Sequence, residues 1–406
     1  MKTGKQFIFI LTIFLMMVFS PEAGRADSFD LFVVPTLDQK LDSWENVPSN
    51  LQPTVYIPAQ IYPYQPFSLR ALFKEYSLSA LKNAYITYDV DIFYPDGKPT
   101  PDQAKDLIAY NGPIKNAKAI IINQQLIDVF FDESYPTGEY EIRITARDHY
   151  SKTTIARSHK ITLAEVDKIA KFASLDFFNF WIKNYFRQPD TSKALFGILQ
   201  YIDDNPDWLR ENIRLISFAR RLVQDNPWLW KHLVKRFQNN PEEQKKIILL
   251  MSLAGERVPE IIAAANKEEN TYFTSLAKNR YLPDVDTDIK SLEQVDTLWG
   301  DFYASGHLDP FEKIVRSLNF FNSESSLEEQ KQSKFVEHEP FRGLVDHLID
   351  IPLATKFSSF LLDYREIGPR AKTQLRLALE AAEAILNEEN PDNPAQDKKN
   401  PPSQPR

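Results

Sequence analysis

Apolar and polar residues alternate along two segments in the first part of the chain. In residues 85–94 every second side chain is apolar and falls on one face of an extended strand: Ile86, Tyr88, Val90 and Ile92. Residues 140–147 repeat this pattern. A period of two predicts half-buried β-strands. Shorter apolar runs predict further strands at 54–57, 67–73, 119–122 and 126–131.

These strand signals fill residues 27–163 and are separated by prolines and turn residues. Six to eight short strands over about 135 residues predict an antiparallel β-sandwich. The segment Pro136–Tyr140 has a Gly-x-Tyr spacing directly before the second alternating strand. This spacing fits the tyrosine corner of an immunoglobulin-like sandwich, and it fits equally well an inward tyrosine after a turn.

From Ala164 onward the apolar period becomes helical. Residues 247–254 are apolar nearly all round and precede Gly255, which predicts a central buried helix. Residues 291–294 predict a capping box. Four sites place a capping Asn or Asp before a proline at a predicted first helical position: Asn205-Pro206, Asn226-Pro227, Asn240-Pro241 and Asp309-Pro310.

The strand pattern followed by the helical pattern predicts a multidomain α+β protein in which strands and helices lie in separate parts of the chain. Residues 27–163 form the immunoglobulin-like β-sandwich and residues 164–387 form an all-α helical array of stacked short hairpins. Residues 388–406 are rich in proline, charge and amides, so we expect a disordered tail.

Residues 1–26 have the order of a secretory signal peptide. Lys2 and Lys5 precede an apolar run from Phe7 to Phe19, and the small residues Gly24 and Ala26 follow. The run has 13 residues, whereas a membrane-spanning helix needs about 20. We therefore expect cleavage near Ala26 and an exported, soluble protein that is periplasmic or secreted. An uncleaved anchor is the alternative, because signal and anchor differ by degree.

Composition excludes several classes of chemistry. The chain has no cysteine, which excludes disulfides, thiolate metal sites and cysteine nucleophiles. Its net charge of −8 argues against nucleic-acid binding. With 11 glycines it has no glycine-rich phosphate loop, and it has no G-x-S-x-G nucleophile elbow. We expect no cofactor.

Two acidic clusters have the residue types of metal sites without the spacing. The triplet Asp284, Asp286 and Asp288 begins like a calcium loop, but Ile289 and Val295 stand where Gly and Glu are needed. We interpret it as an acidic linker before a helix. A second cluster has no zinc-motif spacing and predicts a solvated loop followed by an exposed helix face: Glu337, His338, Glu339, Asp346, His347 and Asp350.

Two further groups have catalytic residue types. Ser305-Gly306-His307 is interpreted as the loop after a helix, because the members of a catalytic triad must converge in space. Asp89 and Asp91 share one strand face, where we expect them to keep an exposed sheet surface soluble. A glycosidase carboxylate pair is the rival interpretation.

The strongest binding hypothesis is a basic surface edged by tryptophan. It comprises Arg210, Arg214, Arg221, Lys231, Lys235, Trp228 and Trp230. Such a patch suits anionic lipid headgroups or an acidic partner. The rival interpretation places the tryptophans between helices and the cations in solvent.

Two parts of the chain resemble uncharacterised exported bacterial proteins. One is the strand region containing YDVDIFYPDG and PTGEYEIRITARD, and the other is the helical region with FFNFWIKNYFRQPD, FARRLVQDNP and VDTLWGDFYASGHLDPFEKIVRSL. The resemblance implies an exported protein with an immunoglobulin-like front and a helical-repeat-like back. It brings no activity and no site residues.

We therefore expect a binding or scaffold protein of the cell envelope that performs no reaction. Its partner would be another envelope protein or a surface component, with peripheral membrane contact as an option and no membrane-spanning segment after cleavage. The alternative is an envelope hydrolase whose site assembles around Glu337–His347 or at the domain junction.

Overall fold

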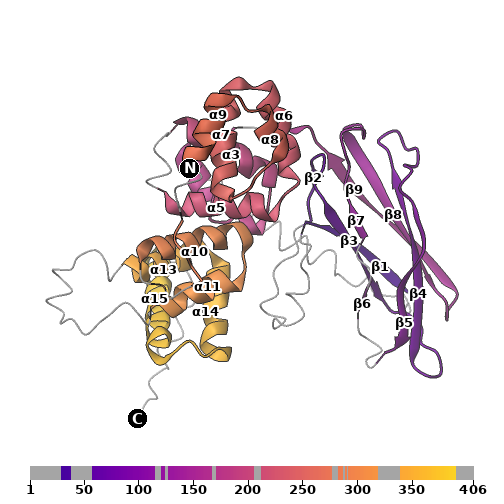
Figure 1. The fold of residues 1–406 in the computed structure, drawn as a ribbon. Coiled ribbons are helices and arrows are strands. Elements are labelled where there is room, and N and C mark those ends of the chain that lie inside the picture. Colours follow the sequence, from indigo (N-terminus) through magenta and orange to yellow (C-terminus); the bar gives the residue numbers. More distant parts are fainter. Residues whose placement is uncertain are drawn as a thin grey trace, which may run out of the picture. The chain divides into compact units, whose positions relative to one another are not determined.

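The structure is a computed structural model, and the chain divides into two compact units (Figure 1). The first unit comprises Met1–Pro35, Ser68–Asp128 and Gly138–Ile161, and the second Thr36–Phe67, Val129–Thr137 and Thr162–Arg406. The structure describes residues 29–37, 57–114, 120–123, 127–166, 171–204, 212–276, 282–286, 289, 291–318 and 339–389. The predicted signal peptide and tail residues 390–406 lie outside this set.

Strands occupy the N-terminal part of the described chain. They are β1 (Asp30–Thr36), β2 (Gln60–Ile61), β3 (Phe67–Lys74), β4 (Asn83–Phe93), β5 (Ala104–Pro113), β6 (Ile121–Ile122), β7 (Ile127–Val129), β8 (Gly138–Asp148) and β9 (Thr153–Leu163). One sheet has the order β1-β3-β6, with β7 also paired to β3, and the other has the order β2-β9-β8-β4-β5. Strand β4 runs antiparallel to β5 and β8, β3 runs antiparallel to β6, and β2 runs parallel to β9.

Three of the predicted strands are confirmed at nearly their predicted bounds, as β3, β4 and β8. The predicted inward side chains of β4 and β8 are buried, and Tyr140 and Tyr88 have no exposed surface. Phe73 of β3 packs against Tyr88 of β4 with ring centroids 6.1 Å apart, so the two sheets contact each other through their apolar faces. The predicted strand at 54–57 is not found at Ile57, and residues 54–56 lie outside the described set.

Helices follow from residue 175 and all belong to the second unit. The described residues contain α2 (Leu175–Ile182), α3 (Thr191–Asp204), α5 (Ile213–Asp225), α6 (Leu229–Asn239), α7 (Gln244–Ala254), α8 (Pro259–Ala264), α9 (Lys267–Leu276), α10 (Leu292–Ser305), α11 (Leu308–Ser317), α13 (Glu339–Asp350), α14 (Pro352–Tyr364) and α15 (Pro369–Glu389). Short 3₁₀ turns lie at Tyr185–Arg187 and Pro241–Glu243.

Some helix-end predictions are confirmed. Ser291 and Gln294 form the expected capping box at the start of α10. Helix α7 is buried along most of its length and ends at Gly255, whose φ of 71° is the left-handed conformation that favours glycine. Ser305 is the last residue of α10, and Gly306 and His307 connect it to α11, so the expected loop at the end of this helix is confirmed.

The Asn-Pro and Asp-Pro predictions are wrong at Asn226 and Asp309 and hold in part at Asn240, which precedes Pro241 at the first position of a 3₁₀ turn. Asn226 accepts from the Trp228 indole and donates to the carbonyl of Leu222, so its side chain is not available as a cap. Asn240 makes no side-chain capping hydrogen bond, and α11 begins at Leu308, one residue before Asp309. The Asn205-Pro206 site lies outside the described residues.

Helices α5 and α10 pack at very short range because Gly300 has no side chain. A Cβ built at Gly300 would lie 2.2 Å from the carbonyl oxygen of Arg214 and 2.6 Å from Cβ of Ser217. This approach brings the start of α5 against one face of α10. Among the described helices, none combines the length and apolarity that a membrane crossing requires.

Candidate functional site

A polar pocket of about 310 Å³ lies in the second unit, where α2, α5 and α10 meet. Its volume falls at the lower end of the range for small-molecule sites. The lining residues are Asn179, Ile182, Lys183, Asn212, Ile213, Arg214, Asp296 and Tyr303. The lining therefore combines two cations, one carboxylate, two amides and one hydroxyl.

Local structure places each of these groups. Asn212 caps α5 by accepting from the amide of Leu215, so the positive end of that helix lies at the pocket. Lys183 is the C-terminal cap of α2, where a cation is favoured. Asp296 and Tyr303 are seven residues apart on α10, and this spacing of two helical turns puts them on one face.

Two ion pairs hold the pocket cations. Nε of Arg214 lies 2.5 Å from Oδ1 of Asp296, and Nζ of Lys183 lies 2.8 Å from Oδ2 of Asp350 at the end of α13. Between 31% and 39% of each of these four side chains is exposed. Ion pairs with this much solvent contact contribute at most about 1 kcal/mol.

A buried histidine lies behind Tyr303. The imidazole of His347 stacks on the indole of Trp299 with centroids 3.7 Å apart. Its Nδ1 contacts the carbonyl oxygen of Gly343, and its Nε2 contacts the hydroxyl of Tyr303. Because a carbonyl only accepts, Nδ1 carries the proton, so Nε2 accepts from the tyrosine hydroxyl.

Burial sets the protonation states of this pair. It lowers the pKa of His347 to about 3, and the nearby charges of Arg214 and Lys183 act in the same direction. Burial also raises the pKa of Tyr303 above its ordinary value. The pair is therefore a neutral imidazole and a protonated phenol at neutral pH.

The pocket and the side chains that contact its lining bring together residues that were predicted to belong to two separate sites. Arg214 belonged to the basic surface, whereas His347 and Asp350 belonged to the acidic cluster of residues 337–350. The prediction of an exposed helix face is wrong for His347, which is 3% exposed, because this position of α13 faces Trp299 and Tyr303. Asp346 is exposed, while Glu337, His338 and the side chain of Glu339 lie outside the described residues.

Sequence reasoning missed Asn179, Lys183, Asp296 and Tyr303 as pocket residues. The only signal for Asp296 and Tyr303 was their helical spacing, and spacing does not reveal which neighbouring helix they face.

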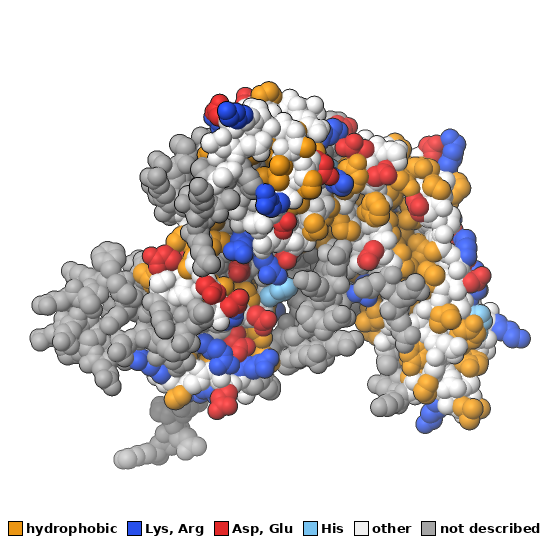
Figure 2. All heavy atoms as spheres, viewed as in Figure 1, with side chains coloured by type: hydrophobic (Ala, Val, Ile, Leu, Met, Phe, Trp, Pro, Cys, Tyr) orange, Lys and Arg blue, Asp and Glu red, His pale blue; other side chains and the backbone are white. Residues whose placement is uncertain are grey.

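The described members of the predicted basic surface differ in their contacts and in their exposure. Arg221 pairs with Asp225 at 2.6 Å, and Lys235 pairs with Glu133 at 3.2 Å. Lys231 is exposed, Trp230 is buried, and Arg210 lies outside the described residues. The half-buried Trp228 meets the ring of His232 edge-on. On the face drawn in Figure 2, cationic and anionic side chains are interspersed over the helices.

The described members of the other acidic triplet contact side chains of α10 and α11. Asp286 pairs with Lys313 at 2.9 Å, and the backbone carbonyl of Asp284 accepts from Gln294. Asp288 lies outside the described residues. Within the described part of the chain, no three His, Asp or Glu side chains are grouped closely enough to hold a metal ion.

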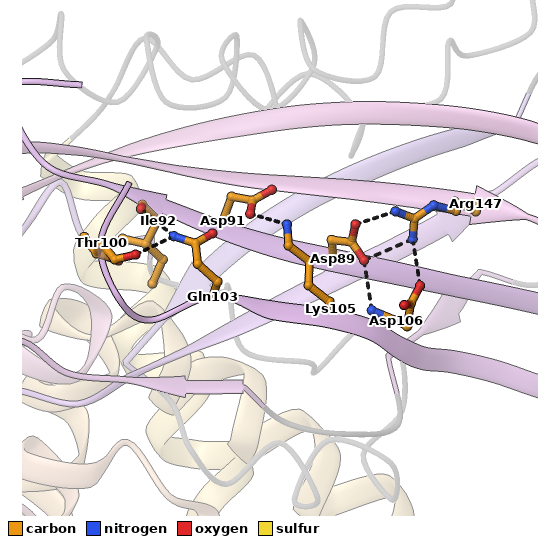
Figure 3. A network of polar contacts seen from close by, with 8 residues as sticks. All are labelled: Asp89, Asp91, Ile92, Thr100, Gln103, Lys105, Asp106 and Arg147. Carbon is orange, nitrogen blue, oxygen red and sulfur yellow. Dashed lines mark hydrogen bonds and ion pairs between the residues drawn. The ribbon is translucent and has the colours of Figure 1, made fainter. Parts of the chain in front are cut away.

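Asp89 and Asp91 lie in a polar network on the sheet of β4, β5 and β8 (Figure 3). Arg147 binds both carboxylate oxygens of Asp89, one of them at 3.0 Å, and the amide of Asp106 donates to Asp89 at 2.9 Å. Asp91 pairs with Lys105. The hydrogen bonds from Arg147 hold the pKa of Asp89 below its usual range.

This network changes the interpretation of Asp89. The prediction of a solvated carboxylate is wrong for this residue, which is 7% exposed because Arg147 from β8 and the bulge of β5 cover it. A glycosidase pair needs one carboxyl held protonated, and the lowered pKa of Asp89 disfavours that role.

Comparisons with known proteins find little similarity. No protein-family model matches the sequence, and no curated protein matches it. One similar solved structure is a family 123 glycoside hydrolase from Clostridium perfringens, studied for glycolipid glycan hydrolysis. It is 10% identical over 42% of this chain, with a TM-score of 0.21, and the match spans 36% of its own length.

Another similar structure is a family 76 glycoside hydrolase from a bovine Bacteroides thetaiotaomicron strain. It is 10% identical over 78% of this chain and 76% of its own, with a TM-score of 0.16. Both TM-scores are far below the level of a shared fold, so neither likeness bears on this chain's activity.

Proposed function

We propose that this protein is an exported binding protein of the cell envelope, periplasmic or secreted, that performs no reaction. Its front would be an immunoglobulin-like sandwich, as in the exported bacterial proteins that the sequence resembles. Its helical unit would hold a small polar ligand in the pocket lined by Lys183, Arg214, Asp296 and Tyr303. Binding to an envelope partner through the basic surface stays a prediction.

The observation that carries this proposal is that the titratable groups in and behind the pocket are engaged in ion pairs and hydrogen bonds within the protein. Lys183 and Arg214 are held in ion pairs, and the hydroxyl of Tyr303 is committed to His347. A general base needs a lone pair aimed at the substrate and a pKa near the working pH. His347 uses both ring nitrogens within the protein, and its pKa of about 3 makes it a poor base.

Catalysis through Tyr303 is also disfavoured. Nucleophilic use of a phenol requires the phenolate, and burial raises the pKa of Tyr303. The same groups are well suited to binding, because fixed charges and amides hold a polar ligand in one orientation without being consumed.

Native mass spectrometry tests this function. The cleaved full-length protein is incubated with a small-molecule extract of the envelope, washed and sprayed. We expect one ligand mass per chain, released unchanged on denaturation and reduced in the Arg214→Gln variant. The Arg221→Gln variant is the control, because Arg221 pairs with Asp225 on its own helix.

Two outcomes count against binding without catalysis. One is that no ligand is retained. The other is that substoichiometric protein depletes a component of the extract and forms a product, which would favour the envelope hydrolase.

A further inference from the structure

The charged side chains in and behind the pocket of the second unit neutralise one another. Arg214 pairs with Asp296, and Lys183 pairs with Asp350 at the end of α13. The guanidinium of Arg214 also hydrogen-bonds the hydroxyl of Tyr303. Together these two cations and two carboxylates have no net charge, and each already has its counter-ion. An ionised ligand would therefore lose its hydration on entering the pocket without gaining an unpaired opposite charge, which costs free energy.

Two asparagines supply hydrogen-bonding groups that carry no charge. Asn179 of α2 and Asn212 at the start of α5 both line the pocket, and both are half-buried. The oxygen of Asn212 accepts from the amide of Leu215 at 3.0 Å. No residue in the described ranges hydrogen-bonds the side-chain amide of Asn179 or Nδ2 of Asn212. Because an asparagine amide both donates and accepts, these groups suit a ligand that does the same.

Apolar surface lies in the same pocket as these amides. Ile182 is on the same helix as Asn179, and Ile213 follows Asn212 directly, and both isoleucines line the pocket. A sugar ring combines the two matching features, because its C–H groups can contact apolar side chains while its hydroxyls donate and accept hydrogen bonds. The volume of about 310 Å³ is at the lower end of the range for small-molecule sites, so the ligand is small.

From these observations we infer that the pocket binds a small neutral polyhydroxy compound, a monosaccharide or a sugar alcohol. Hydrogen bonds to Asn179 and Asn212 and contact with the two isoleucines hold it. This inference rests on the proposed binding function and names its ligand class. The ion pairs of Arg214 and Lys183 form part of the pocket lining and stay intact when the ligand binds.

Titration with defined neutral and charged compounds tests the inference. The intact cleaved protein, labelled with ¹⁵N at its asparagines, is titrated with glucose, galactose, ribose, sorbitol and inositol, and with lactate as an anion and glycine as a zwitterion. We expect saturable shifts of the side-chain amide resonances of Asn179 and Asn212 with at least one neutral compound and none with lactate or glycine. The affinity should change by less than about twofold between low and high salt, because the ligand carries no charge for salt to screen.

Variants separate recognition by the amides from recognition by charge. Asn179→Ala should weaken binding of the neutral compound at least about fivefold, because it removes hydrogen bonds to the ligand. Asn239→Ala is the control and should leave binding unchanged, since Asn239 is the exposed last residue of α6. The double variant Arg214→Gln/Asp296→Asn removes both charges of one pair together, so binding should stay within about threefold of wild type. A ligand recognised by its charge would bind this double variant at least about tenfold more weakly.

Four outcomes overturn the inference: no saturable shift with any neutral compound, equal or stronger binding of lactate or glycine, unchanged binding in Asn179→Ala, or tenfold weaker binding in the double variant. If the neutral compounds fail while an envelope ligand is still retained unchanged, the ligand class is wrong and the binding function stands. If a neutral compound binds and an extract component is turned over, the binding-only function is wrong and the polyhydroxy site stands.

Discussion

The hydroxyl of Tyr303 donates a hydrogen bond to Nε2 of His347, which lies 44 residues further along the chain. Both side chains are buried, and Trp299 covers the imidazole on one face. This contact joins α10 to α13 directly behind the pocket. It fixes the orientation of Tyr303, which lines the pocket.

Removing the tyrosine hydroxyl should destabilise the protein. Tyr303→Phe leaves Nε2 of His347 buried without a donor, and we expect a loss of about 1–3 kcal/mol in the free energy of unfolding. Urea unfolding at pH 7 measures it. The double variant Tyr303→Phe/His347→Met should lose less than the sum of the single losses, because neither polar group then remains buried; strict additivity would argue against this account.

Acid should destabilise the folded state through His347. Its pKa is about 3 when folded and 6.5 in the unfolded chain, so the unfolded chain takes up the proton first. The contribution is fully present above about pH 6.5 and is lost as the pH falls toward 3, at about 1.4 kcal/mol per pH unit where it is steepest.

Urea unfolding at pH 7 and pH 5 isolates this effect. The wild-type protein should lose about 1–2 kcal/mol more than His347→Gln over this interval. Asp89 does not contribute to this difference, because its folded pKa is lowered from 3.8, so its stabilising effect is fully present at both pH values and is lost only at lower pH. Equal losses in the two proteins would show that His347 is not the group responsible.

The short approach of α5 to α10 predicts opposite results for two helical glycines. Gly300→Ala should cost about 2 kcal/mol or more, because its Cβ would meet the backbone of α5 at 2.2 Å. Gly343→Ala is the matched change, since nothing lies within 4 Å of its Cβ, and it should stabilise by about 0.5–1 kcal/mol. Thermal unfolding of both variants checks the difference in sign.

The stability that the bidentate Arg147–Asp89 pair contributes should depend on the shape of the cation. Arg147→Lys keeps the charge but loses the two-pronged contact to the buried carboxylate of Asp89, so we expect a loss of about 1–2 kcal/mol in the free energy of unfolding. Arg143→Lys is the control, because the Arg143–Glu141 pair is more exposed and should change stability by less than about 0.5 kcal/mol. Similar losses in both variants would contradict a special role for Arg147.

The local sequence pattern was sufficient to predict those elements that depend on the properties of neighbouring residues. The alternating side chains of 85–94 and 140–147 became β4 and β8, and the capping box at Ser291 and the glycine end of α7 lie where the sequence places them. Each of these signals acts over a few residues, so it can be read without knowing the fold. The export signal is of the same kind, and it stays a prediction because residues 1–26 lie outside the described structure.

Tertiary structure alone decided which polar groups meet. From sequence spacing, Arg214 was grouped with Trp228, and His347 with Asp346. In the folded protein Arg214 instead forms an ion pair with Asp296, and His347 accepts a hydrogen bond from Tyr303. The reason is that a helix's period shows which residues share a face but not which neighbour covers that face. Gly300 sets the approach of α5 to α10, and Arg214 and Asp296 come together across these two helices. The partner of each charged group, and with it the pocket, therefore depends on a contact between segments about 80 residues apart.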